Sequence, residues 1–129
     1  MTAPSQDELL FFDRRPGALP LYEALRRALF QAVGDVTIQV KKTQISFVCR
    51  RLFGAASFTP VRRAKERPDP FLTVTFGLGY PVESPRIDAR VEAYPGRWTH
   101  HVLIGQEADI DQELVCWLQE AASFAEAKR

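Results

Sequence analysis

Apolar residues recur at helical spacing near each end of the chain. In the first stretch, Pro20 suits an opening helical turn and Gly34 suits a C-terminal stop. In the last stretch, Asp109 and Gln112 have the spacing of a capping box. The apolar stripes that accompany these signals are Leu21, Leu25, Ala28, Leu29 and Ala32, and then Ile110, Leu114, Trp117, Leu118, Ala121 and Ala125. The pattern predicts one amphipathic helix near each end.

Phe30 lies about half a turn away from the stripe of the first helix, taking ~100° per residue. It therefore needs a separate cover. Residues 9–12 (Leu-Leu-Phe-Phe) form an apolar cluster that ends at the breaker sequence of residues 13–17. We expect this cluster to form an arm or a short helix that docks on the first helix and covers Phe30.

Between the two helices the apolar period changes to two, which is typical of half-buried strands. Residues 36–40 and 45–49 alternate in this way, and they form either two strands joined by a tight turn or one long bent strand. Further strands are predicted over residues 53–61, 71–76 and 98–104.

Ser84 and Pro85 suit the start of a short helical turn that runs to Val91. The complete order of elements favours a single α+β domain over residues 1–129, a mostly antiparallel sheet of about five strands with an N-terminal and a C-terminal helix packed on it. Residues 1–19 are then an N-terminal arm, and residues 20–129 are the core.

The composition is that of an ordinary globular domain, with 46% apolar and 26% charged residues. No run is long and apolar enough to cross a bilayer, and the first six residues lack the start of a signal peptide. We therefore expect a cytoplasmic protein without a membrane partner. Cys49 and Cys116 have no Cys or His neighbour at metal-ligand spacing, so we expect two reduced thiols, no metal and no cofactor.

Charge is unevenly distributed although the net charge is only +1. Residues 35–67 contain eight basic and two acidic residues, a net charge of +6, whereas residues 107–129 contain six acidic and two basic residues, a net charge of −4. Such a separation can steer an anionic partner toward one side of the molecule. The alternative is a pair of solvated faces, since exposed charge is the norm for Lys and Arg.

Signatures of common catalytic sites are missing from the sequence. Gly77 and Gly79 lack the Lys and hydroxyl residue of a phosphate-binding loop, and no GxSxG, HExxH or CxxC motif occurs. His100 and His101 are adjacent, and neighbouring side chains of a strand point to opposite faces, so they cannot readily share one metal or one proton. We expect one of them to line a surface and the other to be packed.

Residues 94–101 contain the densest mixture of aromatic and polar side chains and are the best candidates to line a pocket. Arg97 can pair with a carboxylate or a phosphate, and Trp98 can stack on a nucleobase. The alternative is that Trp98 anchors this segment in the core while Arg97 is solvated.

Three segments of the chain have a characteristic order and spacing. They are residues 40–47 (Val-Lys-Lys-Thr-Gln-Ile-Ser-Phe), residues 95–102 (Pro-Gly-Arg-Trp-Thr-His-His-Val), and residues 109–114 followed by Trp117 and Leu118. Together they resemble a bacterial family of domains of unknown function, over about residues 21–122. Members of that family occur alone or joined to other domains, including proteins labelled predicted transport proteins and some with nuclease-like segments. The resemblance implies a stand-alone member and supports the predicted fold. It implies no activity and no role for any residue.

We interpret the chain as a small binding or accessory domain rather than an enzyme, with its basic strands and loop as a surface for nucleic acid or another polyanion. An alternative is a small-molecule sensor or an enzyme built around residues 98–101 and 43–44, with a histidine as acid or base. A third alternative is a homodimer that assembles through exposed apolar residues. The candidate binding residues are Lys41, Lys42, Thr43, Gln44, Arg50, Arg51, Arg62, Arg63, Arg97, Trp98, His100 and His101.

Overall fold

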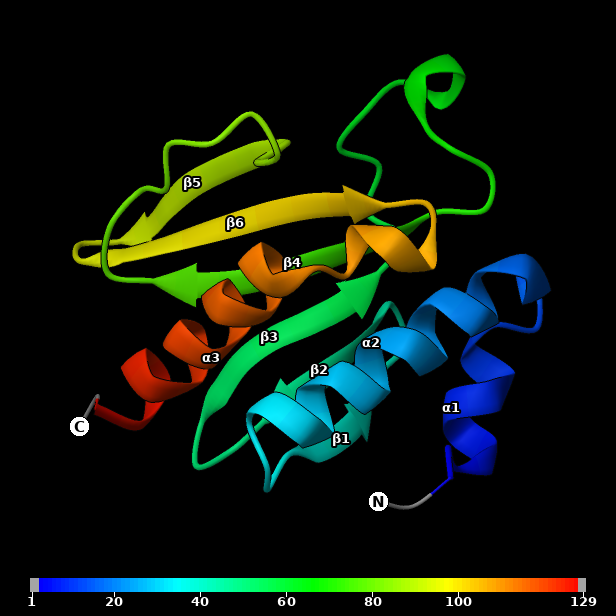
Figure 1. The fold of residues 1–129 in the computed structure, drawn as a ribbon, viewed down its shortest axis with the longest axis horizontal. Helices are drawn as coiled ribbons and strands as arrows, with labels where there is room; N and C mark the ends of the chain where they lie inside the picture. Colours follow the sequence, from blue (N-terminus) through cyan, green and yellow to red (C-terminus); the bar gives the residue numbers. More distant parts are fainter. Residues whose placement is uncertain (1–2, 128–129) are drawn as a thin grey trace.

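The computed structural model describes residues 3–127. Six strands form one antiparallel sheet in the order β1-β2-β3-β4-β6-β5, and α2 and α3 lie on the same face of it (Figure 1). The strands are β1 (Thr37–Val40), β2 (Gln44–Val48), β3 (Leu52–Ser57), β4 (Leu72–Leu78), β5 (Ala89–Tyr94) and β6 (Arg97–Ile104). The helices are α1 (Gln6–Phe11), α2 (Leu19–Ala32) and α3 (Gln112–Ala127), with the 3-10 turns η1 (Pro16–Ala18), η2 (Ala64–Glu66) and η3 (Glu107–Asp109). The predicted α+β fold is confirmed, with six strands where about five were expected.

The core lies between the sheet and the two long helices. Ile45, Ala56, Val74 and Val102 are opposite one another across β2, β3, β4 and β6, and all four are buried. Phe76 extends this layer because its ring stacks on Trp117 of α3, with 5.6 Å between the ring centroids. The period of two in the sequence therefore buries one face of the sheet under helices.

The segment that follows β4 differs from the prediction. Residues 84–91 do not form a helical turn, because the chain enters β5 at Ala89 and pairs with β6 at the edge of the sheet. Five of the six residues of β5 are exposed, including Val91 at 56%. Ala89, Val91 and Ala93 alternate with Arg90 and Glu92, so the period of a strand was present in the sequence, and the helix-start signal of Ser84 and Pro85 misled the prediction.

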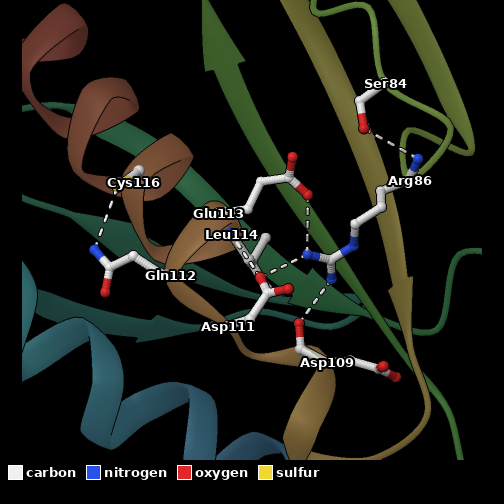
Figure 2. A network of polar contacts seen from close by, with 8 residues as sticks. All are labelled: Ser84, Arg86, Asp109, Asp111, Gln112, Glu113, Leu114 and Cys116. Carbon is white, nitrogen blue, oxygen red and sulfur yellow. Dashed lines mark hydrogen bonds and ion pairs between the residues drawn. The ribbon is translucent and has the colours of Figure 1, made fainter.

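The start of α3 also differs from the prediction. The Asp111 carboxylate, not that of Asp109, accepts the hydrogen bond from the Leu114 N–H group (3.1 Å). Arg86 fastens the segment before β5 to this helix end: it contacts the carboxylates of Asp111 (2.6 Å) and Glu113 (3.4 Å) and donates to the Asp109 carbonyl (2.7 Å) (Figure 2). The predicted capping box of Asp109 and Gln112 is therefore wrong. The helix begins at Gln112, so the residue before it, Asp111, occupies the capping position that we assigned to Asp109.

A buried ion pair attaches α1 to α2. The Glu8 carboxylate lies 2.8 Å from Nε of Arg26 and also accepts hydrogen bonds from the Tyr22 hydroxyl and the Ser5 N–H group. Burial opposes ionisation of Glu8, but these hydrogen bonds and the charge of Arg26 outweigh it and lower the pKa of Glu8. The docking of α1 thus depends on charge as well as on apolar contact.

The apolar cluster of residues 9–12 contributes less than the sequence suggested. Phe12 is buried against the Tyr22 ring, with 5.0 Å between centroids, whereas Leu9 and Leu10 are exposed at 44% and 57%. The Phe30 ring is covered by the guanidinium of Arg26, 4.9 Å from its centroid. A cation from the same helix therefore supplies cover that we expected from residues 9–12.

Candidate binding site on the helix-free face of the sheet

The face of the sheet opposite α2 and α3 has a floor of short side chains. Phe76 of β4 faces the helices, so its neighbour Thr75 faces the other way. Ser46, Ala55, Thr75 and His101 are opposite one another across β2, β3, β4 and β6 and form one row on this face. Three of the four have small side chains; Ser46 and Ala55 are buried, and Thr75 and His101 are the partly exposed members of the row.

Arg97 is held against this floor by Gly77. A Cβ atom at Gly77 would lie 2.6 Å from one terminal guanidinium nitrogen of Arg97 and 2.7 Å from its Cζ, so the guanidinium occupies space that only a glycine leaves open. No acidic side chain among residues 3–127 lies within ion-pair distance of Arg97. The face thus carries a positioned, half-buried cation without a protein counter-ion in this part of the chain.

Thr75 and His101 form a hydrogen-bonded pair beside it. The Thr75 hydroxyl oxygen is 2.8 Å from Nδ1 of His101, which fixes the orientation of the half-buried imidazole. Burial lowers the pKa of His101, so the ring is neutral at neutral pH. A neutral imidazole can donate or accept a hydrogen bond, depending on its tautomer.

Gln44 extends the polar surface to β2, and Ser46 lies buried beside it. The Gln44 side-chain amide donates to the Ser46 hydroxyl at 2.8 Å. Ser46 and His101 are three strand spacings apart, about 14 Å. The partly exposed polar groups of this face therefore extend from Arg97 and His101 as far as Gln44 on β2.

The structure divides the residues that were predicted to line a pocket. Gln44, Arg97 and His101 share the helix-free face, whereas Trp98 and His100 alternate with them and point toward the helices. His100 is fully buried: its ring stacks on Phe76 at 5.0 Å, and its Nε2 accepts from the Val82 N–H group at 3.0 Å. His100 is thus the packed histidine, and His101 is the one on a surface.

The basic candidates do not share one surface. Lys41, Lys42 and Thr43 form the β1–β2 turn, and Arg62 and Arg63 lie in the β3–β4 loop at the same end of the strands. The β2–β3 turn, which contains Arg50 and Arg51, is at the opposite end, as Figure 1 shows. In addition, Arg62 is paired with Asp88 at 2.7 Å. The +6 segment is therefore split between two ends of the molecule.

Sequence reasoning missed Ser46, Thr75 and Gly77. They join Arg97 and His101 through strand pairing, because β4 pairs with β6 and β5 lies outside β6. The alternation of Thr73, Thr75 and Gly77 with apolar residues was the signal that could have shown a polar face on this strand.

Comparison with known proteins identifies a family but no activity. Neither the curated proteins nor the solved structures give a match. Within residues 3–127, no three His, Cys, Asp or Glu side chains are grouped so that they could hold a metal ion, and no helix is long and apolar enough to cross a membrane. A family model matches residues 10–125, and the chain therefore belongs to the family described as Domain of unknown function (DUF5655).

Proposed function

We propose that this domain binds a small organic oxyanion, a carboxylate or a phosphate ester, on the helix-free face of the sheet. The observation that carries the proposal is the Arg97 guanidinium, which lies on Gly77 without an acidic partner among residues 3–127. A guanidinium in a fixed position can donate two parallel hydrogen bonds to a carboxylate or a phosphate. A ligand oxyanion would supply the missing counter-charge.

The surrounding groups suit the rest of such a ligand. Gly77 and Thr75 are two residues apart along β4, about 7 Å, so a molecule on Arg97 also reaches the Thr75–His101 pair. The partly exposed Gln44 side chain, which donates to the buried Ser46 hydroxyl, is available to a longer polar ligand. The ligand is thus held at its acidic end by Arg97 and oriented by neutral donors and acceptors.

The polyanion surface inferred from the charge pattern is the weaker candidate. Its basic residues lie at two ends of the sheet, and Arg62 already has a carboxylate partner. Phosphate contacts that follow one nucleic-acid strand need a continuous basic path. A small oxyanion needs only the one arginine and its neighbours.

The test is a titration of the full chain with inorganic phosphate and with succinate, followed by the amide NMR signals. We expect signals of Thr75, Gly77, Thr99 and His101 to shift with a common dissociation constant. Arg97→Gln should weaken binding about tenfold or more, because a hydrogen bond to a charged group contributes about 1.5–3 kcal/mol. Arg51→Gln removes the same charge at a distant turn and is the matched control. Unchanged affinity in Arg97→Gln would refute the proposal.

Gly77→Ala provides an independent test because it keeps Arg97 but fills the space that its guanidinium occupies. The backbone of Gly77 is not in the left-handed region, so alanine fits the strand, and its Cβ displaces only the end of a flexible side chain. We expect a folded protein in which phosphate and succinate bind as weakly as in Arg97→Gln. Wild-type affinity in Gly77→Ala would show that the position of the guanidinium is irrelevant.

A further inference from the structure

We propose that a second site, for a small aromatic anion, lies in the cavity between the end of α1, the β1–β2 turn and the start of the β3–β4 loop. The cavity has a volume of about 630 Å³. This volume lies within the range of small-molecule sites. None of its lining residues belongs to the site on the helix-free face, so the two sites can be tested separately.

Three cations from two distant segments converge on this cavity. Arg14 and Arg15 approach it from the segment after α1, and Lys42 approaches it from the β1–β2 turn. Asp13 is the acidic residue of the lining, so the local charge is +2. In the part of the chain that the structure describes, neither Arg14 nor Lys42 has a carboxylate within ion-pair distance. The cavity therefore favours an anion.

An aromatic wall forms one side of the cavity and fixes one of the cations. The rings of Phe11 and Phe58 are stacked, with centroids 5.8 Å apart and planes at 13°. The guanidinium of Arg15 lies 4.9 Å from the Phe58 ring centroid and 5.1 Å from that of Phe71. A guanidinium that stacks on a ring keeps its N–H donors in its own plane, where a ligand oxygen can reach them.

Apolar rings beside cations select the class of ligand. An inorganic anion would use the charges and leave the Phe11 and Phe58 rings in contact with water. A molecule that joins a ring to a phosphate or a carboxylate would use both, and the Thr43 hydroxyl at the rim is an additional donor. The chemistry points to an aryl phosphate or an aromatic carboxylate.

Phenyl phosphate and inorganic phosphate are the two probes that test this inference on the full chain. We expect phenyl phosphate to shift the amide NMR signals of Thr43, Phe58 and Thr59 and to bind about tenfold more tightly than inorganic phosphate, because burial of a ring contributes more than the 1.4 kcal/mol that tenfold requires. Equal affinity of the two probes at these signals would overturn the inference.

The double substitution Arg14→Gln with Lys42→Gln should reduce the affinity for phenyl phosphate at least about tenfold, since it removes two charged donors. Both side chains are exposed, so the fold should persist, and a thermal melt checks this. Arg50→Gln with Arg51→Gln removes the same charge at the opposite end of the sheet and should bind like the wild type. Equal weakening by both double variants would mean that only net charge matters, which contradicts the proposed site.

The two proposals fail in different ways. If phenyl phosphate shifts only Thr75, Gly77 and His101, the cavity is not a site and the proposed function stands. If it shifts Thr43, Phe58 and Thr59 in wild type and equally in Arg97→Gln, the cavity is confirmed without support from the helix-free face. If a single-stranded oligonucleotide displaces phenyl phosphate and binds more tightly than it does, the site belongs to a polynucleotide, and the inference of a small aromatic anion is wrong.

Discussion

Thr75 and Phe76 are neighbours in β4, and His100 and His101 are neighbours in β6, yet each pair is divided between two unlike faces of the sheet. Phe76 and His100 stack on each other under α3, where Trp117 completes the group of rings. Thr75 and His101 form their hydrogen bond on the face without helices. The same two strands therefore build a core on one side and a polar surface on the other.

The two histidines show what a helix layer changes. Burial lowers the pKa of both rings. Nε2 of His100 accepts a hydrogen bond from the Val82 N–H group inside the core, and the side chain has no exposed surface. His101 is oriented by one threonine and remains partly exposed. Identical side chains thus serve packing on one face and are available for recognition on the other.

Of the substitutions considered, Phe76→Ala on the helix-covered face should cause the largest loss in the free energy of unfolding. Truncation of a buried phenylalanine costs about 3–5 kcal/mol in the free energy of unfolding, and here it also removes the stacking on His100 and Trp117. Chemical denaturation gives the value. Thr75→Val, the neighbour on the other face, is the control and should stay within about 1 kcal/mol. Similar losses in the two variants would contradict the assignment of the faces.

His100→Leu should have a smaller effect in the same direction. It leaves the Val82 N–H group without its acceptor, and a buried unsatisfied donor costs about 1–3 kcal/mol. His101→Gln keeps a polar side chain on the helix-free face and should alter stability by about 0.5 kcal/mol or less. A larger loss in His101→Gln than in His100→Leu would reverse the comparison.

Acidification should destabilise the fold through both histidines. The pKa of His100 is lowered by burial and by the charges of Arg90 and His101, although the carbonyls of Phe76 and Trp98 oppose this, and the pKa of His101 is lowered by burial. The unfolded chain therefore takes up protons near the ordinary pKa of about 6.5, whereas the folded chain takes them up only at lower pH. Stability is complete above pH 6.5 and decreases as the pH falls below it.

Urea unfolding at pH 7.5 and pH 5.5 measures this loss. Glu8 and Asp111 do not confuse the result, since their pKa values are lowered and their contributions are lost only in more acidic solution. His100→Leu should flatten the pH dependence, and the double variant with His101→Gln should nearly abolish it. A wild-type protein that is more stable at pH 5.5 than at pH 7.5 would contradict the prediction.

The alternation of strand residues predicted that His100 and His101 face opposite sides, and this needs no knowledge of tertiary structure. Which side is covered depends on the contact between Phe76 and Trp117, 41 positions apart in the chain, and no local pattern encodes it. The approach of Gly77 to Arg97 has the same origin, because it follows from the pairing of β4 with β6. The sequence could thus predict the elements other than β5, but not the composition of the candidate site.

The N-terminal segment shows a second limit. Charged residues are rarely buried, so Glu8 and Arg26 were not expected in the interior, yet they are 3% and 5% exposed. Their burial depends on mutual pairing between segments 18 positions apart, with Tyr22 as a further partner. The apolar residues Leu9 and Leu10, which the pattern favoured for docking, are exposed instead.

The two thiols allow the smallest difference between covered and uncovered positions to be measured. Thiol labelling reports the solvent access of a side chain and requires no change in the stability of the protein. Cys49 is half-buried where the sheet meets α2 and α3, and burial, followed by the charges of Glu126 and Asp35, raises its pKa. Cys116 lies on the outer side of α3, exposed, with the Gln112 amide 3.3 Å from its Sγ. The thiolate is the reactive form, and because its pKa is raised, Cys49 forms less thiolate at pH 7.5 than a cysteine with the ordinary pKa would. A thiol reagent should therefore modify Cys116 first in the native protein and Cys49 mainly after unfolding, as mass spectrometry of timed samples would show. Cys116→Ser isolates the slow reaction, and equally fast labelling of Cys49 in that variant would show that the helix layer does not protect this end of the sheet.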